Sequence, residues 1–303
     1  MTDGRKPRLD ARAATLLVVC CALWGLNQVA VKLALPEVPP LLQAGLRSLG
    51  AAALLLLWSL ARGLALFDRD ATLRPGLLAG SLFAAEFGCI FSGLQFTTAS
   101  RMTVFLYLAP LIVALGMPFI AHSERLSGSQ RFGLALAFGG VVWAFAEGLA
   151  GTATTPGQWR GDALGIAAAV MWAMTTLTLR GSRLSGALPE KTLLYQLAVA
   201  GLALTAASVA SGEAMARPWA DLSALSWAAL AYQTVVVTFA SYLAWFWLMR
   251  HYPATRLASF TLLTPVFGLL AGVGLLGEPL TLRLVVAVTA VCAGIWQLNR
   301  QPG

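Results

Sequence analysis

The sequence predicts an all-α integral membrane protein in which ten transmembrane helices form two inverted five-helix repeats, with both termini in the cytoplasm. Three observations predict this fold class: the composition, a series of apolar segments of spanning length, and a pattern that occurs twice. Of the 303 residues, 58% are hydrophobic and 11% are charged, whereas about 25% of the residues in a typical soluble domain are charged. Most of this chain therefore cannot face water, and we expect a single membrane body.

The apolar segments predict the individual helices. A spanning helix needs about 20 predominantly apolar residues, and ten such segments follow one another with short polar connections between them. They are Ala13–Leu35, Pro40–Ala61, Pro75–Phe96, Ala99–Ala121, Gln130–Gly148, Gly161–Arg183, Lys191–Ser211, Leu225–Met249, Ala254–Gly277 and Leu280–Leu298. The proline-rich stretch 36–40 ends the first segment, and the polar stretch 152–158 joins the halves. The first repeat is therefore expected at residues 13–148 and the second at residues 161–298.

A short pattern opens the fourth segment and recurs in the ninth. It consists of Ala, Ser or Thr, and Arg, followed at fixed distances by Phe and Pro. Its residues are Ala99, Ser100, Arg101, Phe105 and Pro110 in the first copy and Ala254, Thr255, Arg256, Phe260 and Pro265 in the second. Further corresponding pairs are Glu124 with Glu278, Trp24 with Trp172, Lys32 with Arg180, and Gly139 with Gly294. A repeat of half the chain length indicates a duplicated unit.

The distribution of basic residues predicts the orientation. Lys and Arg concentrate in the cytoplasmic connections of membrane proteins, and here fifteen lie on the side of the termini against five on the other side. Both termini are therefore expected in the cytoplasm. Because each half contains an odd number of spans, the second half must enter the membrane inverted relative to the first. Inverted repeats allow alternating access, since the two halves can exchange conformations.

These features resemble the drug/metabolite transporter superfamily, specifically its ten-span EamA type with two EamA repeats. The resemblance covers residues 13–298 and rests on Trp24-Gly25-Leu26-Asn27, the repeated Arg, Phe and Pro pattern, and the Glu after the fourth and ninth segments. It implies a multi-pass exporter of small metabolites in the cell inner membrane, with the fifth and tenth spans peripheral. The aromatic-rich spans are similar to those of exporters of aromatic and neutral amino acids. Efflux of drugs or other metabolites by proton antiport is the alternative, and the oligomeric state stays open.

Charged residues inside the spans are candidates for the functional site. Glu86 is the only carboxylate near the middle of any span, where a charge costs about 2.5–3.5 kcal/mol on insertion scales. We expect it to bind a substrate ammonium group or to couple transport to protons, or else to be a neutral packing residue. Arg47 in the second span suits a substrate carboxylate, unless it snorkels to the surface or pairs with Glu37. Lys32 is expected to be a snorkelling anchor.

Two prolines and a set of aromatic and polar residues complete the predicted cavity. Pro110 and Pro265 lie mid-span in corresponding helices, where each removes a backbone donor and frees a carbonyl, so we expect kinks with a gating role. Aromatic side chains away from span ends suit an apolar substrate and attract ammonium groups, although for each one ordinary packing is the alternative. The predicted aromatic lining is Trp24, Tyr107, Trp172, Tyr242, Trp245 and Phe260, and the predicted polar contacts are Asn27, Gln43 and Thr176.

The composition also argues against several function classes. The four cysteines lie in apolar segments without a CxxC pattern or a paired histidine, so we expect no disulfide, metal site or cofactor. The net charge of +8 comes from residues between apolar segments, which argues for a lipid bilayer rather than nucleic acid as the partner. A membrane-embedded enzyme is the main alternative, but the sequence has no HExxH motif or pair of membrane aspartates. No ATP-binding loop is present, so gradients must drive movement of the small-molecule substrate.

Overall fold

Helices account for the regular secondary structure of this protein. The computed structural model describes residues 10–68, 70–120, 127–149, 155–213, 218–252, 257 and 260–299, and no strand occurs among them. Within these residues, seven helical stretches are long and apolar enough to cross a membrane, judged by length and composition, and two of them, Ala99–Ile120 and Ala224–Trp245, consist of more than one helical element. The prediction of an all-α membrane protein is therefore confirmed, whereas the number of spans and the side on which the termini lie remain predictions.

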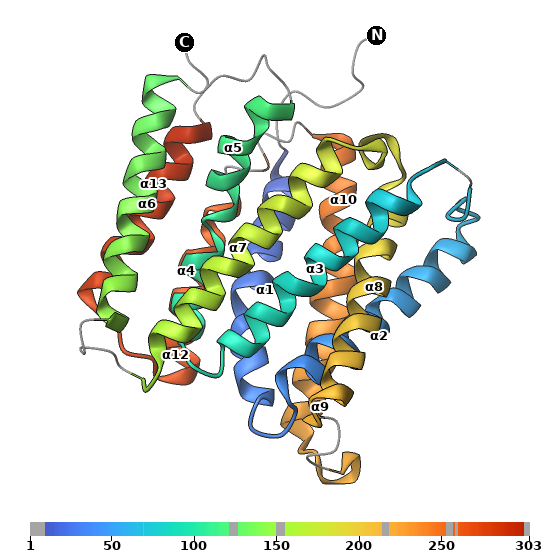
Figure 1. The fold of residues 1–303 in the computed structure, drawn as a ribbon, viewed down its shortest axis with the longest axis horizontal. Coiled ribbons are helices and arrows are strands. Elements are labelled where there is room, and N and C mark those ends of the chain that lie inside the picture. Colours follow the sequence, from blue (N-terminus) through green and yellow to red (C-terminus); the bar gives the residue numbers. More distant parts are fainter. Residues whose placement is uncertain are drawn as a thin grey trace.

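The helices follow the predicted segments, with boundaries that differ by a few residues (Figure 1). In the first half they are α1 (Ala11–Ala34), α2 (Pro40–Ala61), α3 (Leu73–Gly93), α4 (Ala99–Leu106), α5 (Ala109–Ile120) and α6 (Gly128–Leu149). In the second half they are α7 (Gln158–Arg180), η1 (Arg183–Gly186), α8 (Pro189–Ala210), η3 (Trp219–Asp221), α9 (Ala224–Ala231), η4 (Tyr232–Ser241), α10 (Tyr242–His251), α12 (Leu263–Leu276) and α13 (Leu282–Asn299). The elements η1 and η3 are short 3₁₀ turns, and η4 is a π-helix.

Local signals in the sequence determine where several helices begin. The side chain of Asp10 caps α1 by accepting a hydrogen bond from the amide of Ala13 at 2.9 Å. Thr98 caps α4 in the same way, through the amide of Arg101 at 3.1 Å. Pro40 is the first residue of α2, a position where the missing amide proton sacrifices no helical hydrogen bond.

The fourth and ninth predicted spans are both interrupted just before their prolines. Tyr107 and Leu108 separate α4 from α5, and Pro110 is the second residue of α5. Leu262 precedes α12, and Pro265 is the third residue of that helix. Because proline cannot donate to the carbonyl four residues earlier, an interruption within one turn is expected. The two halves therefore contain a break at the same place in corresponding helices.

Two thiol groups donate hydrogen bonds to backbone carbonyls at the break in the ninth span. Cys21 of α1 donates to the carbonyl of Phe260 at 3.3 Å, and Cys292 of α13 donates to the carbonyl of Leu262 at 3.6 Å. Carbonyls at membrane depth need such partners because the bilayer core offers no water. These two cysteines, which are free thiols, thus stabilise an irregular piece of backbone.

The eighth predicted span contains a π-helix. α9, η4 and α10 follow one another directly, so the middle of this span has the wider turn of i→i+5 hydrogen bonding. Side chains support this turn. The hydroxyl of Thr238 donates to the carbonyl of Gln233 at 2.7 Å, and the indole of Trp24 donates to the hydroxyl of Ser241 at 2.8 Å. The π-helix is therefore tied to α1.

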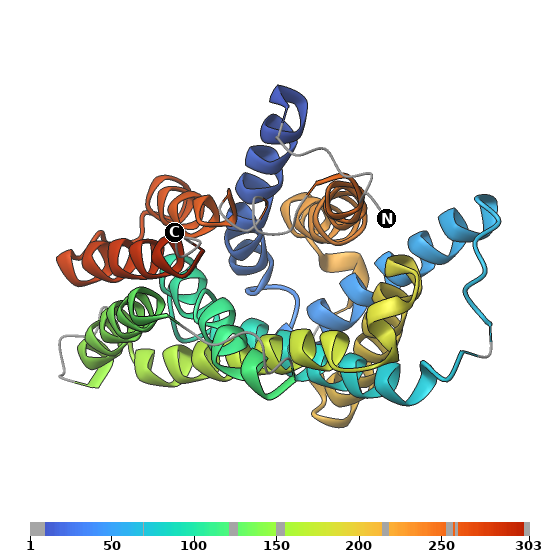
Figure 2. The same cartoon turned by 90° about the horizontal axis from the view of Figure 1, so that it is seen from above.

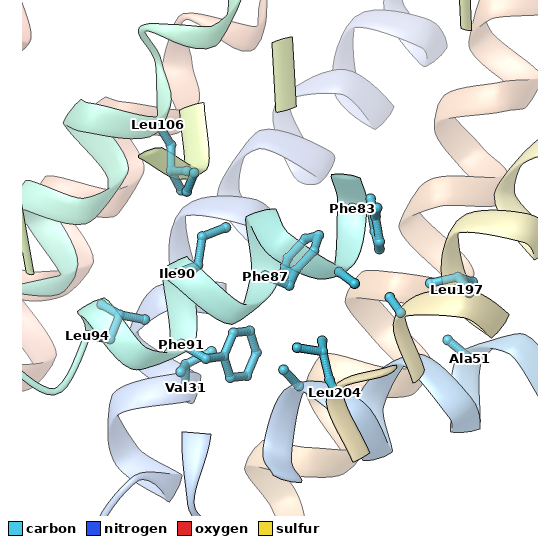
Figure 3. Close-up of a cluster of buried hydrophobic side chains, with 14 of the residues drawn as sticks. Val31, Ala51, Phe83, Phe87, Ile90, Phe91, Leu94, Leu106, Leu197 and Leu204 are labelled. Carbon is cyan, nitrogen blue, oxygen red and sulfur yellow. The ribbon is translucent and has the colours of Figure 1, made fainter. Parts of the chain in front are cut away.

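The main hydrophobic core is built around one face of α3 (Figure 3). Phe83, Phe87 and Phe91 recur every four residues and so lie on one face of the helix. The ring centroids of the first two are 4.5 Å apart, and those of the last two are 6.3 Å apart. Leucines of α8 and alanines of α2 belong to the same cluster.

α6 and α13 lie side by side at one edge of the molecule (Figures 1 and 2). A glycine allows their close approach, since a Cβ atom on Gly133 would lie 2.8 Å from the carbonyl oxygen of Gly294. A second hydrophobic cluster connects these two helices to α4, α5 and α7. α2, α3, α8, α9, η4 and α10 lie toward the opposite side of the molecule (Figure 2).

We expect the substitution Gly25→Ala to destabilise the protein. A Cβ atom at this position of α1 would lie 2.6 Å from the backbone nitrogen of Gly268 in α12, and overpacking of this kind costs about 1–3 kcal/mol. The measurement is the thermal unfolding midpoint of the purified protein in detergent. Gly139→Ala is the matched control, because its Cβ atom would meet nothing within 4 Å. Equal midpoints for the two variants would contradict the close contact between α1 and α12.

Candidate functional site

A buried pair of opposite charges lies inside the helix bundle. Arg47 of α2 is 1% exposed and Glu86 of α3 is 5% exposed. Each interacts electrostatically with the other and with Tyr242 at the start of α10. Within the part of the chain that the structure describes, Nε and Nη2 of Arg47 and Oε2 of Glu86 have no hydrogen-bond partner. The two side chains attract one another electrostatically, but no hydrogen bond joins them. These atoms of both side chains are therefore without a partner among the described residues.

An aromatic platform holds the guanidinium group of Arg47. Its central carbon lies 3.9 Å from the ring centroid of Phe87 and 5.3 Å from that of Phe91, and both rings belong to the stripe on α3 (Figure 3). A desolvated cation–π contact is worth about 2 kcal/mol. The alternatives in which Arg47 snorkels or pairs with Glu37 are wrong. The side chain is buried in this core, and Glu37 instead accepts a hydrogen bond from the amide of Ser223 at 2.7 Å.

The three predicted polar residues, Asn27, Gln43 and Thr176, differ in whether their side-chain oxygens already have a hydrogen-bond partner. Asn27 and Gln43 are buried, and the side-chain nitrogen of Gln43 donates to the carbonyl of Val31 at 3.5 Å. Their side-chain carbonyl oxygens have no partner among the described residues. Thr176 offers less, because its hydroxyl donates to the carbonyl of Trp172 in the same helix at 3.0 Å.

The predicted aromatic residues form two groups rather than one lining. Trp24 of α1 meets Trp245 of α10 edge to face, with ring centroids 5.5 Å apart and 73° between the planes. Tyr107, in the break of the fourth span, meets Trp172 of α7 at 6.2 Å and 89°. Phe260 and Trp245 both pack against the small core that contains the first turns of α1. The repeat-related tryptophans therefore each contact a ring on another helix.

A carboxylate ties helices together at the end of the bundle where α4 and α7 begin (Figure 1). Glu278, after α12, accepts hydrogen bonds from the amides of Ala99 and Ser100 at 2.6 and 3.0 Å and from the Ser100 hydroxyl at 2.6 Å. A negative charge at a helix N-terminus is favourable. Lys32 donates to the carbonyl of Thr97 at 2.8 Å, and its Nζ lies 3.9 Å from Glu278. Lys32 therefore points into the protein, and its prediction as a snorkelling anchor is wrong.

The counterparts of this arrangement in the second repeat cannot be compared with it. Glu124, Ala254, Thr255 and Arg256 lie outside the described residues.

A buried ion pair lies at the same end of the bundle. Nη2 and Nε of Arg101 lie 2.6 and 3.2 Å from the two carboxylate oxygens of Asp162. Nη2 also donates to the carbonyl of Ala144 at 2.6 Å, and the Thr97 hydroxyl donates to Asp162 at 2.6 Å. Arg101 is 3% exposed and joins α4 to α7 and α6.

A second tie lies at the opposite end, between the α2–α3 connection and α8. Nζ of Lys191 lies 2.9 Å from a carboxylate oxygen of Asp70 and donates to the carbonyl of Asp68. The hydroxyl of Thr72 also donates to Asp70, at 2.6 Å. These hydrogen bonds, that of Thr72 foremost, lower the pKa of Asp70 to about 2. Asp70 therefore stays charged at physiological pH and holds the α2–α3 connection to α8.

Sequence reasoning missed several polar residues of these sites. Gln233 in the π-helix is fully buried, and neither polar atom of its amide has a partner within the described ranges. Asp162 and Glu278 flank apolar segments and therefore resemble ordinary loop residues. The repeated pattern was a usable signal for Glu278, because the Glu occurs after both corresponding spans. Among the described residues, no group of three His, Cys, Asp or Glu is placed to hold a metal ion.

We expect Glu278→Gln to accelerate amide hydrogen exchange at Ala99 and Ser100. A carboxamide offers one acceptor oxygen where the carboxylate offers two, and loss of a cap costs about 1 kcal/mol, roughly fivefold in exchange rate. Exchange into the peptide that covers the start of α4 measures this. Glu213→Gln is the matched control, because Glu213 accepts from the amides of Leu41 and Leu42 at the start of α2. Unchanged exchange at α4 in the first variant would refute the cap.

We expect Asp162→Asn to lower the free energy of unfolding by about 3–5 kcal/mol, because it removes the negative charge that Nε and Nη2 of the buried Arg101 contact. Thermal unfolding in detergent measures the loss. Arg160→Gln, at an exposed site on the same helix, should leave the midpoint unchanged. The double variant Arg101→Met with Asp162→Leu should recover part of the loss, since apolar side chains then replace both members of this buried ion pair. A double variant that is less stable than Asp162→Asn would argue against this account.

Comparison with known proteins places the chain in a family. The model of the EamA-like transporter family matches residues 11–146 and 159–300. The chain is 29% identical over 302 residues to the "Uncharacterized transporter YvbV" of Bacillus subtilis, covering 95% of this chain and 92% of that protein. It is 27% identical over 296 residues to the "Probable amino-acid metabolite efflux pump" of Salmonella typhimurium, covering 95% and 94%.

A solved structure described as "Crystal structure of protein" shares the fold. Its TM-score is 0.64 at 20% sequence identity, and the match covers 95% of this chain and 97% of that one. The matched fold and the family model that covers both halves confirm the resemblance seen in the sequence. The chain belongs to the EamA-like transporter family, within the drug/metabolite transporter superfamily.

Proposed function

We propose that this protein is a secondary transporter that exports small metabolites, with aromatic and neutral amino acids as the favoured substrates, by alternating access through a central cavity. The observation that carries the proposal is the buried pair Arg47 and Glu86, whose polar atoms lack partners among the described residues of an apolar body. Charged residues inside spans are rare and typically mark substrate or ion pathways. The relative named as an amino-acid metabolite efflux pump supports the choice of substrate class.

The proposed topology is ten spans in two inverted repeats, with both termini in the cytoplasm. The pairing of helices supports it, because several of the main contacts between helices have a counterpart in the other half. The contact of α1 with α12 corresponds to the contact of α7 with α4 and α5. The contact of α3 with α7 corresponds to the contact of the span α9, η4 and α10 with α1. The edge position of α6 and α13 supports peripheral fifth and tenth spans. A relative named as an inner membrane transporter, YedA of Escherichia coli, supports placement in the inner membrane; it is 28% identical over 279 residues.

The breaks before Pro110 and Pro265 are proposed to act as gating hinges. Each separates an outer piece of its span from an inner piece, and interrupted helices in inverted repeats are typical of alternating access. In the described state, the outer piece of the fourth span is fixed by Glu278 and by the pair of Arg101 with Asp162. We propose that this end is closed here and that the other end opens to receive substrate.

Proton antiport of drugs or other metabolites is the second candidate, and Glu86 is the observation that favours it. A buried carboxylate with an unpartnered oxygen can take up and release a proton during the cycle. The titratable and charged groups that interact with it electrostatically are Arg47 of α2, Tyr242 of α10 and Cys89 of α3. Coupling through Glu86 would require protonation to alternate with substrate binding at this place.

Counterflow in proteoliposomes tests the proposed function. Vesicles loaded with unlabelled phenylalanine, tryptophan or leucine should accumulate the labelled compound, whereas vesicles loaded with a sugar should not. Uptake that persists without a pH gradient supports export down a metabolite gradient. Uptake that requires the gradient and loses its pH dependence in Glu86→Gln supports antiport. Failure of every amino acid, with normal folding of the reconstituted protein, would overturn the proposed substrate class.

A further inference from the structure

Two buried arginines among the described residues, Arg101 and Arg47, differ in how their charge is compensated. Arg101 gives Nε and Nη2 to the two oxygens of Asp162, at 3.2 and 2.6 Å. Arg47 is equally buried, yet its Nε and Nη2 have no partner among the described residues, although Glu86 is close enough to attract it. A buried charge without a bonded partner is costly. The edge of Arg47 that carries Nε and Nη2, and that could bind a carboxylate, therefore lacks a bonded partner among the described residues, which lowers the stability of the folded protein.

The packing around Arg47 covers the face of the guanidinium and leaves that edge without a hydrogen-bond partner among the described residues. The guanidinium stacks on Phe87, with its central carbon 3.9 Å from the ring centroid. Stacking uses the flat face of the group, while its N–H bonds lie in the plane and stay available for a two-point contact. Glu86 precedes Phe87 in α3, so its carboxylate emerges about 100° around the helix from the ring that carries the cation. The scaffold thus holds both charges near one another and keeps them from pairing.

We propose that Arg47 and Glu86 together recognise the α-carboxylate and the α-ammonium group of one zwitterionic amino acid. Nε and Nη2 of Arg47 bind the carboxylate through two parallel hydrogen bonds, and Oε2 of Glu86 accepts from the ammonium group. This inference rests on the proposed function and adds which two groups of the substrate the protein recognises.

The charge balance selects this class of ligand. An amine without a carboxylate would satisfy Glu86 but leave the arginine unpaired, and a hydroxy acid would leave the glutamate unpaired. A zwitterion satisfies both, and the complex of two protein charges and two ligand charges is neutral. Sites that hydrogen-bond a given group reject analogues without it, because their own buried groups then stay unpaired. The site should therefore reject both kinds of analogue.

The test uses matched sets of probes in proteoliposomes. Phenylalanine, phenethylamine and 3-phenyllactate form one set, and leucine, isoamylamine and 2-hydroxyisocaproate form the other. For the wild-type protein, each amino acid should be transported with an efficiency on the order of tenfold or more above both of its analogues, the scale expected for one charge-assisted hydrogen bond. This measurement needs no variant and so does not depend on whether a substitution folds.

Two variants then assign the two ends. Arg47→Gln should lower amino-acid transport until the amino acid and the corresponding amine are transported with equal efficiency. Glu86→Gln should lower it until the amino acid and the corresponding hydroxy acid are transported with equal efficiency. Arg62→Gln is the matched control, because Arg62 lies exposed at the end of α2; its selectivity should equal that of the wild type. Size-exclusion profiles and unfolding midpoints check the fold of each variant.

The outcomes separate this inference from the proposed function. If amino acids are transported but the amines or hydroxy acids are transported equally well, the inference is overturned while the proposed function stands. The inference also fails if folded Arg47→Gln and Glu86→Gln proteins keep the wild-type selectivity. If no amino acid is transported at all, the proposed substrate class fails and the inference fails with it.

Discussion

The absence of water in the bilayer core is the constraint on which this structure depends. Every polar group placed there must find its partner within the protein or in a ligand. The protein meets this demand with the ion pair of Arg101 and Asp162 and with the thiols of Cys21 and Cys292 at a broken helix. Where the demand is met, the groups hold helices together. It is unmet at Arg47 and Glu86, whose buried atoms Nε, Nη2 and Oε2 have no partner among the described residues.

The connections at the ends of the helices link one half of the chain to the other. Glu278 of the second half binds the start of α4, and Glu213 binds the start of α2. Glu37 of the first half binds the amide before α9, and Asp70 pairs with Lys191 of α8. Because these contacts cross between the halves at both ends, a rearrangement of one half must change the connections of the other. Such coupling suits a protein whose two repeats are proposed to exchange conformations.

Much of the fold follows from hydropathy alone, but the polar contacts do not. Apolar segments of spanning length located the helices to within a few residues, because helix length in a membrane is set by bilayer thickness. The repeat pointed to the prolines, and helix breaks occur there. The alternatives considered for Arg47 and the role expected of Lys32 were wrong, because the contacts of a buried charge depend on which helices meet in space. The π-helix has no sequence marker, since its hydrogen-bond pattern arises from packing against α1 and α2.

The π-helix has a mechanical consequence for the residues that follow it. An α-helix advances by about 100° per residue, so a shift of one hydrogen-bond step within η4 would turn the whole of α10 about its axis by a comparable angle. Only a few bonds, such as that of Thr238 with Gln233, must be exchanged in such a step. Tyr242 and Trp245 would rotate together, one leaving Arg47 and the other leaving Trp24. A shift of this kind would therefore change the aromatic and the charged parts of the site at the same time, through the hydrogen bonds of a single turn.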